Sequence, residues 1–295
     1  MTANAIRNPG EVSALEHQRQ VLMHRASRIV PVVLLFLLSM VVIAPVVWTI
    51  STSLRKGTES FTVPPRWLPT DMAVENYEEV FRKVPFGRQI INSTLITWGT
   101  VIGQLVSASL AGYAFARLEF RGRDALFWIV LATMMIPIQA VVIPTFIFLR
   151  NLGLVDTLWS LILPAVPTAF GTFLLRQYFL TIPIELEESG LMDGANQWQL
   201  FYRIYLPLVK PGMAVLAVLS FNFHWNEFFR PLIFLIDNDN FPITLGIFQL
   251  QGYMMTGAIA VVLAGVVMSL VPVIIIYLFG QRYLIEGIMR GAIKG

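Results

Sequence analysis

The chain has 295 residues, of which 56% are hydrophobic and 13% are charged, and its mean hydropathy is +0.68. Soluble domains are about 25% charged, so this composition excludes an ordinary water-soluble protein and predicts an all-α integral membrane protein. The net charge of +3 argues against a nucleic-acid partner. Cysteine is absent and the three histidines are scattered, so neither disulfides nor a metal site is expected.

Six windows are apolar and long enough to cross a bilayer, which takes about 20 helical residues. In chain order they are Ile29–Ile50, Ile90–Ala116, Ala125–Leu149, Thr157–Leu175, Gly212–Ile236 and Ala258–Gly280. All but the fifth lack Asp, Glu, Lys and Arg. The first is too long for the core of a signal peptide and has no A-x-A site, so we expect it to stay as an anchor.

Basic residues set the orientation of these windows. With a cytoplasmic N-terminus, 13 of the 21 Lys and Arg residues fall on the cytoplasmic side. Six more lie in Ser51–Gln89, where five acidic residues nearly balance them. We therefore predict six transmembrane helices with both termini in the cytoplasm. The expected parts are a cytoplasmic arm (1–28), a single transmembrane domain (29–280) and a cytoplasmic tail (281–295).

Prolines recur inside the windows, and each removes an internal hydrogen bond and can bend its helix. They are Pro31, Pro45, Pro137, Pro144, Pro164, Pro167 and Pro272. Two interpretations stay open. The bends are either ordinary irregularities of membrane helices or hinges that open and close a path.

The polar loop at 176–211, between the fourth and fifth windows, predicts an elbow of two helices on the cytoplasmic face. Thr181 and Pro183 suggest the start of the first helix. Asp193 and Gly194 predict a turn, and the spacing of Asn196 and Gln199 predicts a capping box that opens the second helix. An apolar stripe at helical spacing follows in that helix: Leu200, Phe201, Ile204 and Tyr205.

Small residues gather at the tip of this elbow, where another protein could approach closely: Ser189, Gly190, Gly194 and Ala195. The alternative is an interfacial connector that touches only lipid. An anionic leaflet would repel the acidic side chains of this loop, however, so we favour a protein partner.

The elbow resembles the EAA signature of binding-protein-dependent ABC importer permeases: E-A-A, three residues, G, nine residues, then I-x-L-P. Glu188 opens the signature, Gly194 is its glycine, and Ile204 begins the closing I-x-L-P. Ser189 and Gly190 replace the two alanines, and Gly190 could loosen the helix by up to about 1 kcal/mol. Further segments resemble the carbohydrate branch of these permeases, in particular the maltose-type second permease: "NYEEVF", "NST", "AGYAFARLEFRGR", "MMIPIQAVVIPTF", "WNEFFRPL" and "QRYLIEGIMRGAIKG".

The resemblance implies the ABC type I importer fold, with a coupling helix between helices four and five that docks on an ATPase. The implied function is to translocate, across a bacterial cytoplasmic (inner) membrane, a carbohydrate delivered by an extracytoplasmic binding protein. The implied partners, besides that protein and the lipid bilayer, are a second, different permease chain and two ATPase subunits. No GxxxxGK[ST] loop occurs in the chain, so ATP and Mg are expected on the ATPase, this chain is expected to bind no cofactor, and it is not expected to be an enzyme.

Residue by residue, the resemblance assigns two contact regions for the ATPase. The coupling residues are Glu188, Ser189, Gly190, Asp193, Gly194, Ala195, Ile204, Leu206 and Pro207. The tail residues are Gln281, Arg282, Gly287, Gly291, Lys294 and Gly295. The outer loops Ser51–Gln89 and Asp237–Gly257 are expected to meet the binding protein, although Asp237–Gly257 is equally consistent with a re-entrant hairpin.

The fifth window holds "FNFHWNEFFRP", a charged cluster at membrane depth, where ionisable groups are functional suspects. Glu227 and Arg230 are three residues apart and can pair, and a polar stripe of Asn222, Asn226 and Arg230 is expected on one helix face. The candidates for a substrate path are Gln139, Asn222, Trp225, Asn226 and Glu227, with Asn92 and Gln104 as further polar residues. The alternative is an ion pair that only anchors the helix. His224 is expected to pack and to form hydrogen bonds.

Other functions stay open at this point. The same machinery could import a glycerol-phosphate-type ester or a polyol. An ion-coupled secondary transporter would need intramembrane carboxylates and an internal repeat, and the sequence offers only Glu227 and no visible repeat. An integral membrane enzyme would need a clustered nucleophile or metal motif, and neither HExxH nor GxSxG occurs.

Overall fold

The computed structural model of the protein describes residues 9–56, 68–69, 71–252 and 258–292, with side chains between residues 29 and 283 of these ranges. Within them all regular elements are helices, as predicted. In chain order they are α1 (Pro9–Ser53), α2 (Glu75–Lys83), α3 (Phe86–Arg117), α4 (Arg123–Thr133), α5 (Ile138–Asn151), α6 (Trp159–Ile162), η2 (Leu163–Ala165), α7 (Ala169–Leu180), α8 (Glu185–Met192), α9 (Gln197–Gln199), η3 (Leu200–Tyr205), α10 (Leu206–Leu208), α11 (Lys210–Trp225), α12 (Phe229–Phe234), η4 (Asn238–Asn240), α13 (Ile243–Leu250) and α14 (Ile259–Ala292).

Three of the predicted windows are single continuous helices: the first in α1, the second in α3 and the last in α14. The third and fourth are bent pairs, because α4 and α5 meet at 99° and the α6–η2 segment meets α7 at 41°. The fifth is divided between α11 and α12, and α11 also meets the preceding segment at 71°. The six predicted windows therefore differ in form, because three are continuous helices and three are bent or broken. The described residues form three clear spans, and up to six if each bent pair counts as one.

Proline explains two of the breaks. Pro137 stands just before α5 with an extended backbone (ψ 141°) and has no N–H to continue the preceding helix. Pro164 lies in the short 3₁₀ turn η2, and Pro167 directly precedes Thr168, which caps α7 by accepting a hydrogen bond from Gly171 N–H. The other four prolines stay inside α1, α5 and α14. Proline alone therefore does not determine where a helix breaks.

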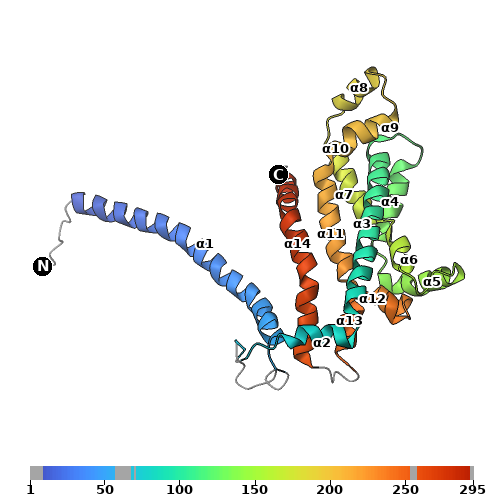
Figure 1. Ribbon diagram of the computed structural model, residues 1–295. Helices are drawn as coiled ribbons and strands as arrows, with labels where there is room; N and C mark the ends of the chain where they lie inside the picture. The colour runs from blue at the N-terminus through green and yellow to red at the C-terminus, as the bar shows by residue number, and fades with distance from the viewer. Residues whose placement is uncertain (1–8, 57–67, 70, 253–257, 293–295) are drawn as a thin grey trace.

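Figure 1 shows α3, α7 and α11 side by side as the central bundle, with α14 alongside and α1 standing apart from it. The elbow of α8 and α9 lies at one end of the bundle, and α2 and α13 lie at the other. One buried apolar cluster joins α3, α7, η3 and α11 below the elbow, and a second one lies around α2 and α13. No residue of the apolar window of α1 is buried, as expected of a segment that faces lipid or another subunit.

Candidate functional site

The elbow forms where the sequence predicts it, between α7 and α11. The capping box is confirmed: Asn196 Oδ1 accepts Gln199 N–H at 2.9 Å, and Gln199 Oε1 accepts Asn196 N–H at 2.8 Å. Gly194 has a left-handed backbone (φ +82°), which an L side chain rarely adopts. The predicted start of the first helix is wrong, because α8 begins at Glu185 and Thr181 instead ends α7, donating its hydroxyl to Tyr178 O.

Gly190 faces the inside of the elbow, so it does not belong to the expected outward tip of small residues. A Cβ atom placed on Gly190 would lie 2.6 Å from Leu200 Cδ2 and 2.9 Å from Ile204 Cδ1. The missing side chain therefore lets α8 close against η3. Its neighbour Ser189 is exposed and donates its hydroxyl to Glu185 O at 2.7 Å.

The second helix of the elbow is a π-helix, η3, where the sequence predicts an ordinary helix. Leu206 N–H reaches back five residues to Phe201 O. Pro207 follows and has no N–H to donate, so the usual bond to the fourth residue before it is lost. Short π-helical turns of this kind are frequent at functional sites.

A buried group of three polar side chains ties the elbow to the bundle. Arg117, at the end of α3, donates from Nη2 to the carbonyls of Phe179 (2.7 Å) and Ile182 at the end of α7. Its Nη1 lies 3.9 Å from the Glu187 carboxylate of α8. Tyr205 of η3 donates its hydroxyl to the same carboxylate, and its ring lies 5.0 Å from the Arg117 guanidinium. Arg117, Glu187 and Tyr205 thus connect α3, α7, α8 and η3.

The outer side of the elbow carries large apolar side chains. We call this set the elbow face: Leu186, Leu191, Met192 and Trp198. Met192 is 89% exposed and Trp198 is 66% exposed. Exposed apolar patches of this kind mark sites of contact with another protein or with the membrane.

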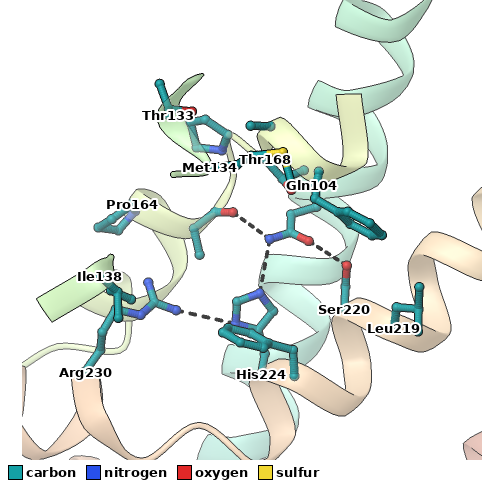
Figure 2. Close-up of a pocket in the computed structure, with 15 residues that line it drawn as sticks. Gln104, Thr133, Met134, Ile138, Pro164, Thr168, Leu219, Ser220, His224 and Arg230 are labelled. Carbon is teal, nitrogen blue, oxygen red and sulfur yellow. Dashed lines mark hydrogen bonds between the residues drawn. The ribbon is translucent and has the colours of Figure 1, made fainter. Parts of the chain in front are cut away.

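A second polar group lies inside the bundle, around His224 of α11 (Figure 2). Gln104 Nε2 donates to Ala165 O at 2.8 Å and lies 3.1 Å from His224 Nε2, while Ser220 donates to Gln104 Oε1 at 2.6 Å. The expected Glu227–Arg230 pair forms and is buried. His224 Nδ1 lies 3.2 Å from the Glu227 carboxylate.

The carbonyl of Ala165 fixes the direction of these hydrogen bonds. It can only accept, so the amide nitrogen of Gln104 must face it, and the same nitrogen must also donate to His224 Nε2. The histidine proton therefore lies on Nδ1, which donates to Glu227 at 3.2 Å. Arg230 Nη2 lies 3.4 Å from the same nitrogen (Figure 2) but forms no hydrogen bond with it, because both groups are then donors. A continuous chain of hydrogen bonds runs from α3 through α11 to the ion pair.

The sequence model of one family, described as "Binding-protein-dependent transport system inner membrane component", matches residues 104–285, which include both the elbow and the His224 group. The chain belongs to this family. It is 34% identical over 233 residues to the arabinooligosaccharides transport system permease protein AraQ of Halalkalibacterium halodurans, covering 77% of this chain and 81% of that protein. It is 30% identical over 264 residues to the diacetylchitobiose uptake system permease protein NgcG of Streptomyces coelicolor, covering 88% and 87%.

A further relative of this permease, at 30% identity over 241 residues, is the sn-glycerol-3-phosphate transport system permease protein UgpE of Escherichia coli; the match covers 78% of this chain and 85% of that protein. Among solved structures, a chain from a bacterial ABC transporter involved in the import of the acidic polysaccharide alginate superposes with a TM-score of 0.78 at 28% identity, covering 88% of this chain and 96% of that one. The expected importer permease fold is thus confirmed.

The predicted substrate-path residues of the permease have different surroundings in the structure. Trp225 is buried, stacks on Phe221 at 5.5 Å and donates Nε1–H to Ser269 O of α14, so it packs two helices together. Asn222 and Asn226 are exposed and bonded to each other in the last turn of α11. The expected stripe through Arg230 is wrong, because α11 ends at Trp225. Gln139 is exposed in the first turn of α5.

The predicted tail contacts fall on the last helix or beyond it. Gln281 and Arg282 lie in α14, and Gln281 Nε2 donates to Leu278 O at 3.2 Å. Gly287 and Gly291 belong to the same helix. Lys294 and Gly295 lie outside the described residues. Among the residues described, no three His, Asp or Glu side chains gather as metal ligands would.

Sequence reasoning missed the Arg117–Glu187–Tyr205 group. The available signal was weak: Arg117 directly follows an apolar window, and Glu187 is one of three acidic residues in a short stretch. The structure distinguishes Glu187 from the other two acidic residues by its burial. Glu187 is 8% exposed, whereas Glu185 and Glu188 lie on the surface.

Proposed function

We propose that this chain is a permease subunit of an ATP-driven importer that translocates a carbohydrate delivered by an extracytoplasmic binding protein across a bacterial inner membrane. Membership of the family supports the transport role, and two relatives, AraQ and NgcG, are named for oligosaccharide cargo. The observation that carries the proposal is the elbow, a docking-competent surface joined to α3 and α7 by buried polar contacts.

The elbow is the coupling element in this proposal. The chain has no phosphate-binding loop of its own, so force must arrive from a separate ATPase. Glu188, Ser189, Asp193 and Gly194 are on the exposed side that meets the ATPase. Gly190 and Ile204 act from the inside by fixing the shape of the elbow, together with Ala195, Leu206 and Pro207. The tail residues 281–295 supply a second contact.

In the proposed orientation, the two ends of the bundle lie on opposite sides of the membrane (Figure 1). Both termini and the elbow lie in the cytoplasm, and the opposite end with α2 and α13 faces the binding protein. A solved structure of an alginate transporter in complex with its periplasmic protein shares the fold, with a TM-score of 0.62 at 18% identity. The assembly comprises this permease, a second permease chain, two ATPase subunits that hold ATP and Mg, and the binding protein.

Two alternatives differ in cargo or energy source. The relative UgpE is named for sn-glycerol 3-phosphate, so a phosphate ester or a polyol is the second candidate cargo. An ion-coupled carrier is a distant alternative, because the carboxylate it would use, Glu227, is held in an ion pair with Arg230.

Reconstitution of the purified complex in proteoliposomes tests the proposal. Uptake of labelled oligosaccharide should require ATP, the ATPase subunits and the binding protein. Gly194→Asp should insert normally yet lose ATP hydrolysis stimulated by the binding protein. Uptake without ATPase subunits, or full transport by Gly194→Asp, contradicts the proposal.

A further inference from the structure

We propose that a cavity in this chain, beside His224 and Arg230, is a contact site for the cargo and selects uncharged sugars over anionic ones. The cavity has a volume of about 580 Å³, within the range of small-molecule sites. This inference rests on the proposed function and adds the charge of the cargo and the place where this chain touches it.

The cavity lies where three breaks in the helices meet (Figure 2). Thr133 and Ile138 border it from the two sides of the α4–α5 bend, and Pro164 and Thr168 from the two sides of the η2–α7 break. Arg230 reaches it from α12, just beyond the end of α11. Non-helical backbone at membrane depth is tolerated where it is buried in protein or lines a water-filled cavity. Three such breaks around one space are consistent with a cavity that admits water or a polar ligand.

The electrostatics of the cavity disfavour an anion. Among the described residues that line it, Arg230 is the one permanently charged side chain. Its charge is balanced by Glu227, which it contacts through both Nε and Nη2. A phosphate or carboxylate that entered the cavity would lose its water and find no free cation to replace it.

The hydrogen-bonding groups instead suit hydroxyls, which both donate and accept. Arg230 has five N–H groups, and its bonds to Glu227 and Leu161 O use three of them. Thr168 accepts from Gly171 N–H, which leaves its hydroxyl hydrogen for another acceptor. Ser220 donates to Gln104 and keeps its oxygen lone pairs as acceptors. Donors and acceptors therefore occur together, without net charge.

The wall of the cavity also offers aromatic surface. Phe223 is 60% exposed and Phe170 is 41% exposed, and both line the cavity. A sugar ring presents hydroxyls at its edge and C–H groups on its faces. The combination of polar neutral groups and exposed rings matches both surfaces.

The relatives are named for cargo of different charge. Two relatives are named for arabinooligosaccharides and diacetylchitobiose, whereas others are named for sn-glycerol 3-phosphate and the acidic polysaccharide alginate. The neutralised Arg230 places this chain with the first group.

The test is binding of four probes to the purified permease–ATPase complex in nanodiscs, without the binding protein: arabinotriose, diacetylchitobiose, sn-glycerol 3-phosphate and an alginate trisaccharide. At least one neutral probe should bind about tenfold or more tightly than either anion. Phe223→Ala should weaken the binding of that probe by about fivefold or more. Phe148→Ala is the matched control, because Phe148 is 63% exposed but does not line the cavity. Phe223→Lys adds an unpaired cation and should reduce the difference in affinity between the neutral and the anionic probes.

Three outcomes would overturn the inference: anions that bind as tightly as the neutral probes, no binding of any probe, or equal effects of Phe223→Ala and Phe148→Ala. ATP-driven uptake with the binding protein is measured on the same complex. If uptake is intact and one of these outcomes is seen, only the cavity proposal is wrong. If none of the probes is taken up, the proposed function is contradicted.

Discussion

Arg117 and Glu187 meet in the buried junction between the end of α3 and the first helix of the elbow, with Nη1 and the carboxylate oxygen 3.9 Å apart. The same carboxylate accepts the hydroxyl of Tyr205, so one acidic side chain links two helices of the elbow to the bundle. The buried Arg117–Glu187 contact therefore joins α8 directly to α3.

Glu187→Ala should destabilise the protein far more than Glu188→Ala, although the two residues are adjacent. Removing one partner of a buried ion pair costs about 3–5 kcal/mol, and the long separation of this pair favours the lower value. Glu188 is exposed, so its removal should change the free energy of unfolding by less than about 0.5 kcal/mol. Thermal unfolding of the purified variants gives the comparison. Equal losses for the two would refute the role of the junction.

Gly190→Ala should destabilise the elbow even though alanine favours helices by up to about 1 kcal/mol. The added Cβ meets Leu200, which is fully buried and has little room to move. Overpacking of this kind costs about 1–3 kcal/mol, so the net effect should be a loss. Ser189→Ala is the matched change at the next position and should be neutral or slightly stabilising, because Ser189 is exposed. A higher melting temperature for Gly190→Ala would show that α8 and η3 are not closely packed.

Gly194→Ala should cost about 1–2 kcal/mol, because an L residue is strained in the left-handed conformation. Gly194→Asn should cost less, since asparagine tolerates this region better than other residues. The space beside Gly194 is open, so the ranking tests backbone conformation and not packing. ATP hydrolysis stimulated by the binding protein should follow the order Gly, Asn, Ala. A reversed order of Asn and Ala would rule out backbone strain as the cause.

Glu227→Gln and Arg230→Gln should each destabilise the protein by about 3–5 kcal/mol, because each leaves the other charge buried and alone. The double variant should recover a large part of this loss, since no uncompensated charge remains. Melting temperatures of the two single variants and the double variant give the coupling energy. Additive losses would mean that the two side chains do not interact.

The sequence predicted the elbow well because its signals are local. The capping box depends on residues three positions apart, and the turn at Gly194 depends on one dihedral angle. Helix breaks were harder to predict, because Pro137 breaks a helix and Pro144 does not. A membrane helix tolerates a proline where other groups can satisfy the freed backbone, so the residue type alone does not predict a break.

The polar group in the bundle could not be predicted for a related reason. Gln104 and His224 are 120 residues apart, and Arg117 and Glu187 lie on different helices. Periodicity within one window cannot pair residues across helices. The same periodicity predicted that Trp225 lines a substrate path, whereas Trp225 is buried against α14.

The central claim is that the elbow lies in the cytoplasm and contacts the ATPase, and cysteine labelling tests it most directly. The chain contains no cysteine, so Met192→Cys on the elbow and Met72→Cys before α2 give single probes at opposite ends of the bundle. Both methionines are highly exposed, at 89% and 72%. With a membrane-impermeant maleimide, Met72→Cys should react only from outside the cell. Met192→Cys should react only in inverted vesicles and should be protected once the ATPase subunits are bound. Labelling of both from the same side, or no protection of Met192→Cys by the ATPase, would contradict the account.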